Sequence, residues 1–136
     1  MRIIIIFILL AALASPSARA ARKKGEKTET TQKTETEATK FAQQGVEAAK
    51  SKDWNKAIKM FRKATDLDKK FTTNLVVAYQ HRAFEAAGQQ KYQDAIADLT
   101  EALKVNPQDV RTYEQRAAMT EMAETDAKRI RELEQK

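Results

Sequence analysis

Residues 54–67, WNKAIKMFRKATDL, and residues 92–105, YQDAIADLTEALKV, follow one pattern. Each begins with an aromatic residue, places Ala-Ile three residues later, and continues with an apolar residue, an alanine and an apolar residue at the same offsets. Self-similarity at a period of some tens of residues is typical of stacked helical repeats. The duplicated stretch therefore predicts the fold before any single residue is considered.

The residues upstream of each copy add a further helix to the unit. Phe41 and Gly45 precede the first copy, and Tyr79 and Ala83 stand at the corresponding places before the second. Apolar residues in both upstream segments follow helical spacing. Pro107 closes the second unit. Each unit thus reads as a helix with an aromatic and a small residue, a tight turn, a helix with the Ala-Ile pattern, and a break.

This unit resembles the tetratricopeptide repeat, whose pattern W-x2-L-G-x2-Y…A-x3-F…P has the same order. The resemblance covers residues 38–136. It departs from the family at Gln44 and Arg82, which occupy the usual leucine position, at Lys69 in place of the closing proline, and by four extra residues, 72–75. The fold that the resemblance implies is all-α, an α-solenoid of antiparallel helix pairs.

A third unit is expected to begin at Val110. Tyr113 and Ala117 are in register for its first helix, and Ile130 and Leu133 for its second. The second helix is highly charged, and we interpret the unit as a degenerate cap. A stack needs such a cap because its last repeat has no neighbour to cover the apolar face. The sequence therefore predicts about three units.

The N-terminal part of the chain is predicted to lie outside the repeats. Residues 1–20 combine a basic start, an apolar run up to Ala14 and small residues before Ala20, which is the pattern of a secretory signal peptide cleaved after Ala20. An uncleaved anchor is the alternative, although the apolar run is shorter than the about 20 residues of a membrane span. Residues 21–37 hold no large apolar residue and predict a disordered linker. The repeat domain is then 38–136.

The same features favour an exported bacterial protein. The chain has no cysteine, and its last residues, Leu133-Glu134-Gln135-Lys136, are not a luminal retention signal. We therefore expect a periplasmic or secreted protein that is stabilised by packing alone.

The charge of the chain limits its partners. The formal net charge is +6, and the lysines from Lys50 to Lys70 make the first unit basic. Such a surface can attract nucleic acid, anionic lipid or an acidic protein. Export argues against nucleic acid, so we expect no nucleic-acid partner, whereas contact with an anionic surface stays an alternative.

No motif in the sequence indicates catalysis. His81 is the single histidine, and no nucleophile or orienting residue is marked for it. Gly25, Gly45 and Gly88 form no phosphate-binding loop. No His, Asp and Glu residues cluster at metal-ligand spacing. We predict a non-enzymatic protein without cofactor or metal.

The resemblance implies where a partner would bind. In this family the first helices of the pairs line a concave groove that binds an extended peptide or a helix of another protein. The positions carried over onto this chain are Val46 and Ala49 with Ala42, then Val77, Gln80, His81, Phe84 and Ala87, then Arg111, Glu114, Gln115 and Ala118. Family members that capture chaperone C-terminal carboxylates use Lys and Asn where this chain has Ala42, Val46 and His81. That mode of binding is therefore not expected.

We predict that this groove binds an apolar peptide segment or helix, with Phe84 as its hot spot. Packing of Phe84 between the units is the alternative. Two other functions stay open. One is a structural envelope component that self-associates end to end through its first unit. The other is a scaffold held on anionic surfaces by the basic first unit and by Arg22-Lys23-Lys24.

Overall fold

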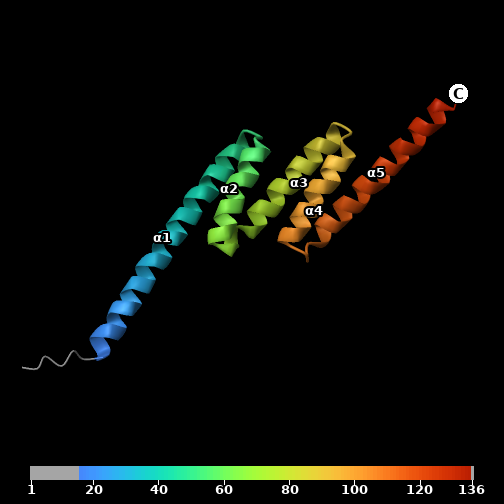
Figure 1. The fold of residues 1–136 in the computed structure, drawn as a ribbon. Helices are drawn as coiled ribbons and strands as arrows, with labels where there is room; N and C mark the ends of the chain where they lie inside the picture. Colours follow the sequence, from blue (N-terminus) through green and yellow to red (C-terminus); the bar gives the residue numbers. More distant parts are fainter. Residues whose placement is uncertain (1–15, 136) are drawn as a thin grey trace, which may run out of the picture. The chain divides into compact units, whose positions relative to one another are not determined.

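The computed structural model describes residues 16–135, and these contain helices but no strand. The all-α class predicted from the repeats is thereby confirmed. The chain divides into two compact units, Met1–Lys33 and Thr34–Lys136. Within the second unit the helices lie side by side in chain order (Figure 1). The elements are α1 (Pro16–Lys50), α2 (Trp54–Leu67), the short 3₁₀ helix η1 (Lys69–Phe71), α3 (Thr72–Gly88), α4 (Tyr92–Val105) and α5 (Val110–Glu134).

Small residues lie where the helices of a pair meet. A Cβ atom added to Gly45 of α1 would lie 2.7 Å from Cε1 of Phe61 on α2, so any larger residue would force the ring to move. Ala57 and Ala95, the alanines of the two Ala-Ile pairs, are fully buried. Their burial confirms that the repeat pattern marks packing positions.

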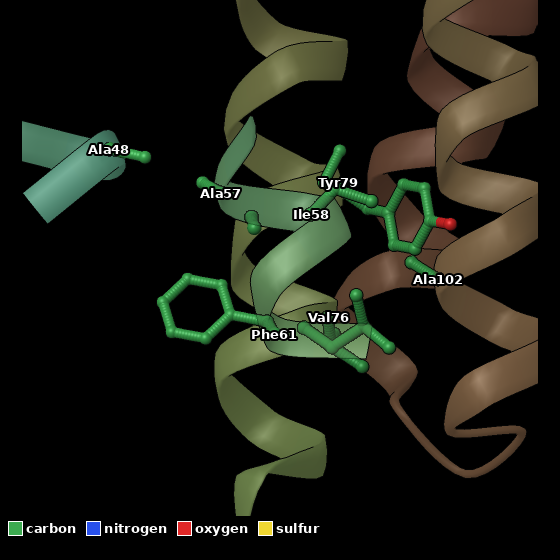
Figure 2. Packing of buried hydrophobic residues seen from close by; sticks show 9 residues of the cluster. Ala48, Ala57, Ile58, Phe61, Val76, Tyr79 and Ala102 are labelled. Atoms are coloured by element: carbon green, nitrogen blue, oxygen red, sulfur yellow. The ribbon is translucent and has the colours of Figure 1, made fainter. Parts of the chain in front are cut away.

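The core consists of two apolar clusters along the stack. One cluster joins α1 to α4, and a second, formed by Ala83, Ala95 and Leu99, joins α3 to α4 and extends to Met119 of α5. Each helix pair therefore covers the apolar face of the next, which is how a repeat stack is stabilised. The first cluster consists of Ala48, Ala57, Ile58, Phe61, Leu75, Val76, Ala78, Tyr79 and Ala102 (Figure 2).

Both helix pairs turn with the same backbone geometry. In the second turn the N–H of Gln90 donates to the carbonyl of Ala87, and the N–H of Lys91 donates to that of Ala86, each at 2.9 Å. This is a Schellman motif, in which the residue after the helix adopts the left-handed conformation. Gln90 accordingly has φ 60°, and Lys52, at the equivalent place in the first turn, has φ 56°.

Gln90→Gly should stabilise the fold by about 1 kcal/mol, because a side chain in the left-handed region costs about 1–2 kcal/mol that glycine avoids. Urea unfolding followed by circular dichroism measures the change. The neighbouring Gln89 has φ −95°, so Gln89→Gly is the matched control and should lower stability slightly. A destabilised Gln90→Gly variant would contradict the assignment of strain to this turn.

The first unit ends without a proline, and Asp68 shapes the break. Its carboxylate contacts Lys70 Nζ at 2.7 Å and accepts a hydrogen bond from the Lys70 backbone N–H at 3.0 Å. These interactions lower the pKa of Asp68 below its ordinary value. The four extra residues, 72–75, form the first turn of α3, and Leu75 among them is buried. The insertion therefore lengthens α3 at its beginning.

The third unit differs from the prediction in having one helix. α5 continues from Val110 to Glu134, and within residues 16–135 no second helix folds back over Tyr113. The sequence after Pro107 holds neither proline nor glycine, so nothing interrupts a run of good helix formers. Tyr113, Ile130 and Leu133 are consequently exposed. α5 packs against α4.

The N-terminal predictions concern residues that the structure describes only in part. Most of the predicted signal peptide, residues 1–15, lies outside the described residues. Residues 16–20 and the predicted linker, 21–37, are helical as part of α1, which is rich in residues of high helix propensity. The three domain boundaries stay predictions. No helix within residues 16–135 is both long and apolar enough to cross a membrane.

Candidate functional site

An open cavity of about 400 Å³ lies between α1 and α3, next to the start of α2. Six of its ten lining residues are apolar, and Lys50 carries its one formal charge. Mostly apolar walls with a few polar groups are usual for ligand-binding sites. The lining residues are Val46, Ala49, Lys50, Trp54, Phe61, Thr73, Asn74, Val77, Ala78 and His81.

Two stacked rings form part of the cavity wall. The ring centroids of Trp54 and His81 are 4.7 Å apart, and their planes differ by 7°. Trp54 is held at the first position of α2, where the Asp53 carboxylate accepts a hydrogen bond from the Lys56 N–H at 3.0 Å. The repeat pattern identifies Trp54 only as a packing residue. Trp54 lines the cavity because α3 lies close enough for His81 to stack on its ring.

Four of the predicted groove residues meet in this cavity. Val46 and Ala49 come from α1, and Val77 and His81 come from α3. Val46 and Val77 are each 40% exposed, so both present an apolar surface to solvent. Side chains from α1 and α3 therefore line one cavity.

Other predicted groove residues lie elsewhere. Phe84 is 74% exposed on α3 and does not line the cavity, and this exposure also excludes packing between the units. Arg111 and Glu114 are exposed on α5, away from the cavity lining. Ala42 is buried at 6% exposure and has little surface for a ligand.

Gln80 has a structural role that the groove prediction did not include. Its Nε2 donates hydrogen bonds to Thr112 Oγ1 at 2.7 Å and to Asp109 Oδ2 at 3.1 Å. The Thr112 hydroxyl in turn donates to Asp109 Oδ2 at 2.6 Å, and Thr112 is fully buried. Gln80 therefore joins α3 to the start of α5.

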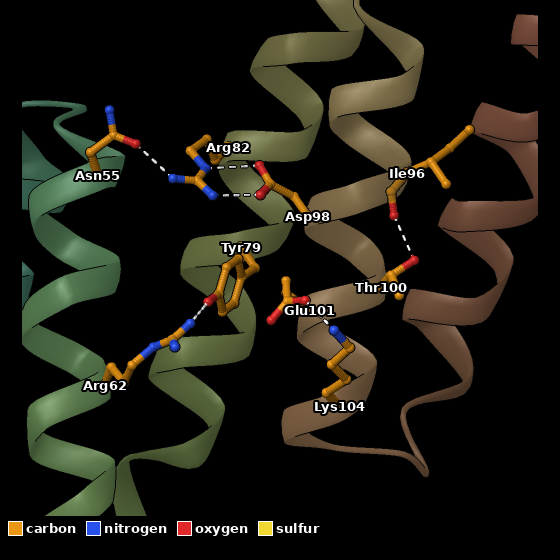
Figure 3. Close-up of polar contacts among 9 residues, drawn as sticks. All are labelled: Asn55, Arg62, Tyr79, Arg82, Ile96, Asp98, Thr100, Glu101 and Lys104. Atoms are coloured by element: carbon orange, nitrogen blue, oxygen red, sulfur yellow. Dashed lines mark hydrogen bonds and ion pairs between the residues drawn. The ribbon is translucent and has the colours of Figure 1, made fainter.

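A polar network connects α2, α3 and α4 (Figure 3). Nε and Nη2 of Arg82 donate to the two carboxylate oxygens of Asp98 at 2.8 Å and 2.5 Å, and Nη1 donates to Asn55 Oδ1 at 2.6 Å. The hydrogen bonds to Asp98 raise the pKa of Arg82 above its ordinary value. Where the repeat family has leucine, this chain thus has a bidentate ion pair.

Tyr79 connects the same helices from within the core. It is only 2% exposed, and its hydroxyl accepts a hydrogen bond from Nη2 of Arg62. The guanidinium carbons of Arg62 and Arg82 lie 5.9 Å and 5.8 Å from its ring centroid. Two cation–π contacts hold the ring in place. Two of the three helices that line the cavity, α2 and α3, are therefore linked by specific contacts as well as by apolar packing.

The chemistry available at the cavity is binding by shape and apolar contact. Within the part of the chain that the structure describes, no three His, Asp or Glu side chains are grouped to hold a metal ion. The imidazole of His81 stacks on Trp54. The arrangement favours recognition of an apolar group.

Two known proteins are similar to part of this chain. Heat shock protein STI1 of Saccharomyces cerevisiae is 37% identical over 70 residues, which are 52% of this chain and 11% of that protein. Protein STIP1 homolog of Dictyostelium discoideum is 35% identical over 71 residues, which are 52% of this chain and 12% of that protein. The chain thus spans only about a tenth of the length of these relatives. No protein-family model and no solved structure matches the chain.

These similarities support a helical repeat of the tetratricopeptide type. The matched share of each relative is small, so what the whole relatives do is not transferred to this chain.

The predicted localisation is wrong. Both relatives are eukaryotic proteins, from a yeast and from Dictyostelium, and one is a heat shock protein. They contradict the assignment to the bacterial periplasm or to secretion. That assignment rested on the first twenty residues and on two absences, of cysteine and of a retention signal, and not on the repeat pattern itself.

Proposed function

We propose that this chain is a protein–protein interaction module whose cavity between α1 and α3 binds an apolar side chain of a partner peptide or helix. The cavity itself carries the proposal. It is open, it measures about 400 Å³, and apolar residues from three helices line it. Four of its ten lining residues, Val46, Ala49, Val77 and His81, stand where the repeat family places its groove.

The energetics of the site favour such a ligand. Val46 and Val77 each leave 40% of their surface exposed, and covering them would contribute about 25 cal/mol per Å² of apolar area. The stacked Trp54 and His81 rings give the cavity a preorganised wall, which reduces the entropy lost on binding. Thr73 and Asn74 can hydrogen-bond the backbone of a bound segment.

Val77→Glu should weaken binding at least about tenfold, because binding would bury a carboxylate among apolar groups. Peptides selected on the purified chain from a random displayed library serve as ligands. Trp54 is the single tryptophan of the chain and lines the cavity, so its fluorescence reports the titration.

Leu67→Glu is the matched control for this experiment. Leu67 is 39% exposed, nearly the same as Val77, but does not line the cavity. The affinity of Leu67→Glu should equal that of the unchanged protein. Selected peptides that bind Val77→Glu as tightly as the unchanged protein, or that lose as much affinity with Leu67→Glu, would place the interaction on a different surface.

A further inference from the structure

The outward-facing residues of α2 and α4 carry opposite charges at equivalent repeat positions. α2 holds four basic residues and one acidic residue, whereas α4 holds three acidic residues and one basic residue. Along the exposed stripe of each helix, three pairs of equivalent positions carry charges of opposite sign. Lys56 corresponds to Asp94, Lys63 to Glu101, Asp66 to Lys104, and Lys59 to Ala97.

Most of these charges are available to a partner. Within the described residues, Lys56, Lys59 and Asp94 make no ion pair. The ion pair of Glu101 with Lys104 joins side chains that are 40% and 67% exposed, so it contributes little and can exchange partners. Figure 3 shows this ion pair on α4.

We propose that this outer face of α2 and α4 binds a second copy of the chain, with α2 of each copy against α4 of the other. A two-fold axis parallel to the helices brings each residue opposite its repeat equivalent, because α2 and α4 occupy equivalent places in successive pairs. Lys56 then faces the partner's Asp94, and Lys63 faces the partner's Glu101. The symmetry repeats both contacts.

The shape of the acidic half suits this arrangement. An open cavity of about 490 Å³ lies there, lined in part by Asp94, Ala97 and Glu85. Lys59 of the other copy would meet the small Ala97 and place its ammonium beside the two carboxylates. Glu85 and Asp94 have no ion-pair partner in residues 30–135. Of the two cations that line this cavity, Arg82 is paired with Asp98, whereas Lys91 is exposed and makes no ion pair in the same residues. Three carboxylates against two cations leave the cavity net negative.

The dimer should be weak and sensitive to salt. Exposed ion pairs individually contribute little, and salt screens them. The same charges could instead only attract α2 to α4 within one molecule, but that attraction would not depend on protein concentration. The surface is separate from the cavity between α1 and α3, so the dimer does not depend on the proposed peptide binding.

Two charge-reversed forms of the full chain test the proposal by sedimentation velocity. One is Lys56→Glu with Lys63→Glu, and the other is Asp94→Lys with Glu101→Lys. The unchanged protein should dimerise at about 0.01 M salt, where the screening length is about 30 Å, and dissociate at about 1 M, where it is about 3 Å. Each variant alone should dimerise at least about tenfold more weakly, because like charges then face each other. An equimolar mixture of the two should restore association.

Mixing the two variants distinguishes association through the proposed face from association through any other surface. All four substituted side chains are at least partly exposed, and circular dichroism checks that the helices are retained. A monomeric unchanged protein at low salt would overturn the proposal. So would a dimer that charge reversal leaves unchanged, or folded variants that fail to associate when mixed.

Discussion

Phe61→Ala should lower the free energy of unfolding by about 3–5 kcal/mol, whereas Phe84→Ala should lower it by less than about 0.5 kcal/mol. Phe61 is 4% exposed and its ring lies directly against Gly45, so truncation leaves a cavity between α1 and α2. Phe84 is 74% exposed, and its removal opens no cavity.

Urea denaturation followed by circular dichroism compares the two variants under identical conditions. Because the residue type and the substitution are the same, burial is the principal difference between them. Equal losses of stability would contradict the packing described for α1 and α2. The Phe84→Ala variant also tests the predicted hot spot. If Phe84 contributes to binding, the variant loses affinity for a selected peptide without a change in melting temperature.

Asp98→Ala should destabilise the fold by about 2–3 kcal/mol, since it removes two charge-assisted hydrogen bonds and leaves Arg82 without its carboxylate. The side chain of Asp98 is only 11% exposed, but that of Arg82 is 35% exposed. Solvent reaches the guanidinium, so the loss should be smaller than for a fully buried pair.

A double variant, Arg82→Leu with Asp98→Leu, tests whether the ion pair stabilises the fold. Apolar residues of similar volume often replace such pairs at little cost. The double variant should therefore lose much less stability than the summed losses of the single variants Arg82→Leu and Asp98→Leu, all measured by the same denaturation assay. Additive losses would show that Arg82 and Asp98 act independently, contrary to their bidentate contact.

The packing of the first two units was predictable because their pattern is local. Ala57 and Ala95 recur at one position of a helical period, and side chains on one helical face are buried together. The turns were less visible. Lys52 and Gln90 give no signal of a left-handed conformation, which follows from the Schellman hydrogen bonds and not from residue type.

The candidate site was predictable only in part, because it depends on the placement of one helix pair against the next. Val46 and Val77 belong to different units, and their shared cavity follows from how α3 packs beside α1. The family resemblance assigned Gln80 to the groove as well, whereas its amide hydrogen-bonds Thr112 and Asp109 at the start of α5. Residues on one helical face thus have different roles, depending on which neighbouring helix each one contacts.

The sequence by itself determined the all-α class, the pairing of α1 with α2 and of α3 with α4, and the buried small residues. These features depend on contacts along one helix and across one short turn. There, the number of residues between two positions determines whether they lie on the same helical face. Only the tertiary structure decided that Trp54 stacks on His81 and that Gln80 hydrogen-bonds Thr112. The angle between successive pairs is set by many weak contacts across the whole stack. It decided which exposed residues line a cavity and which remain on an open surface.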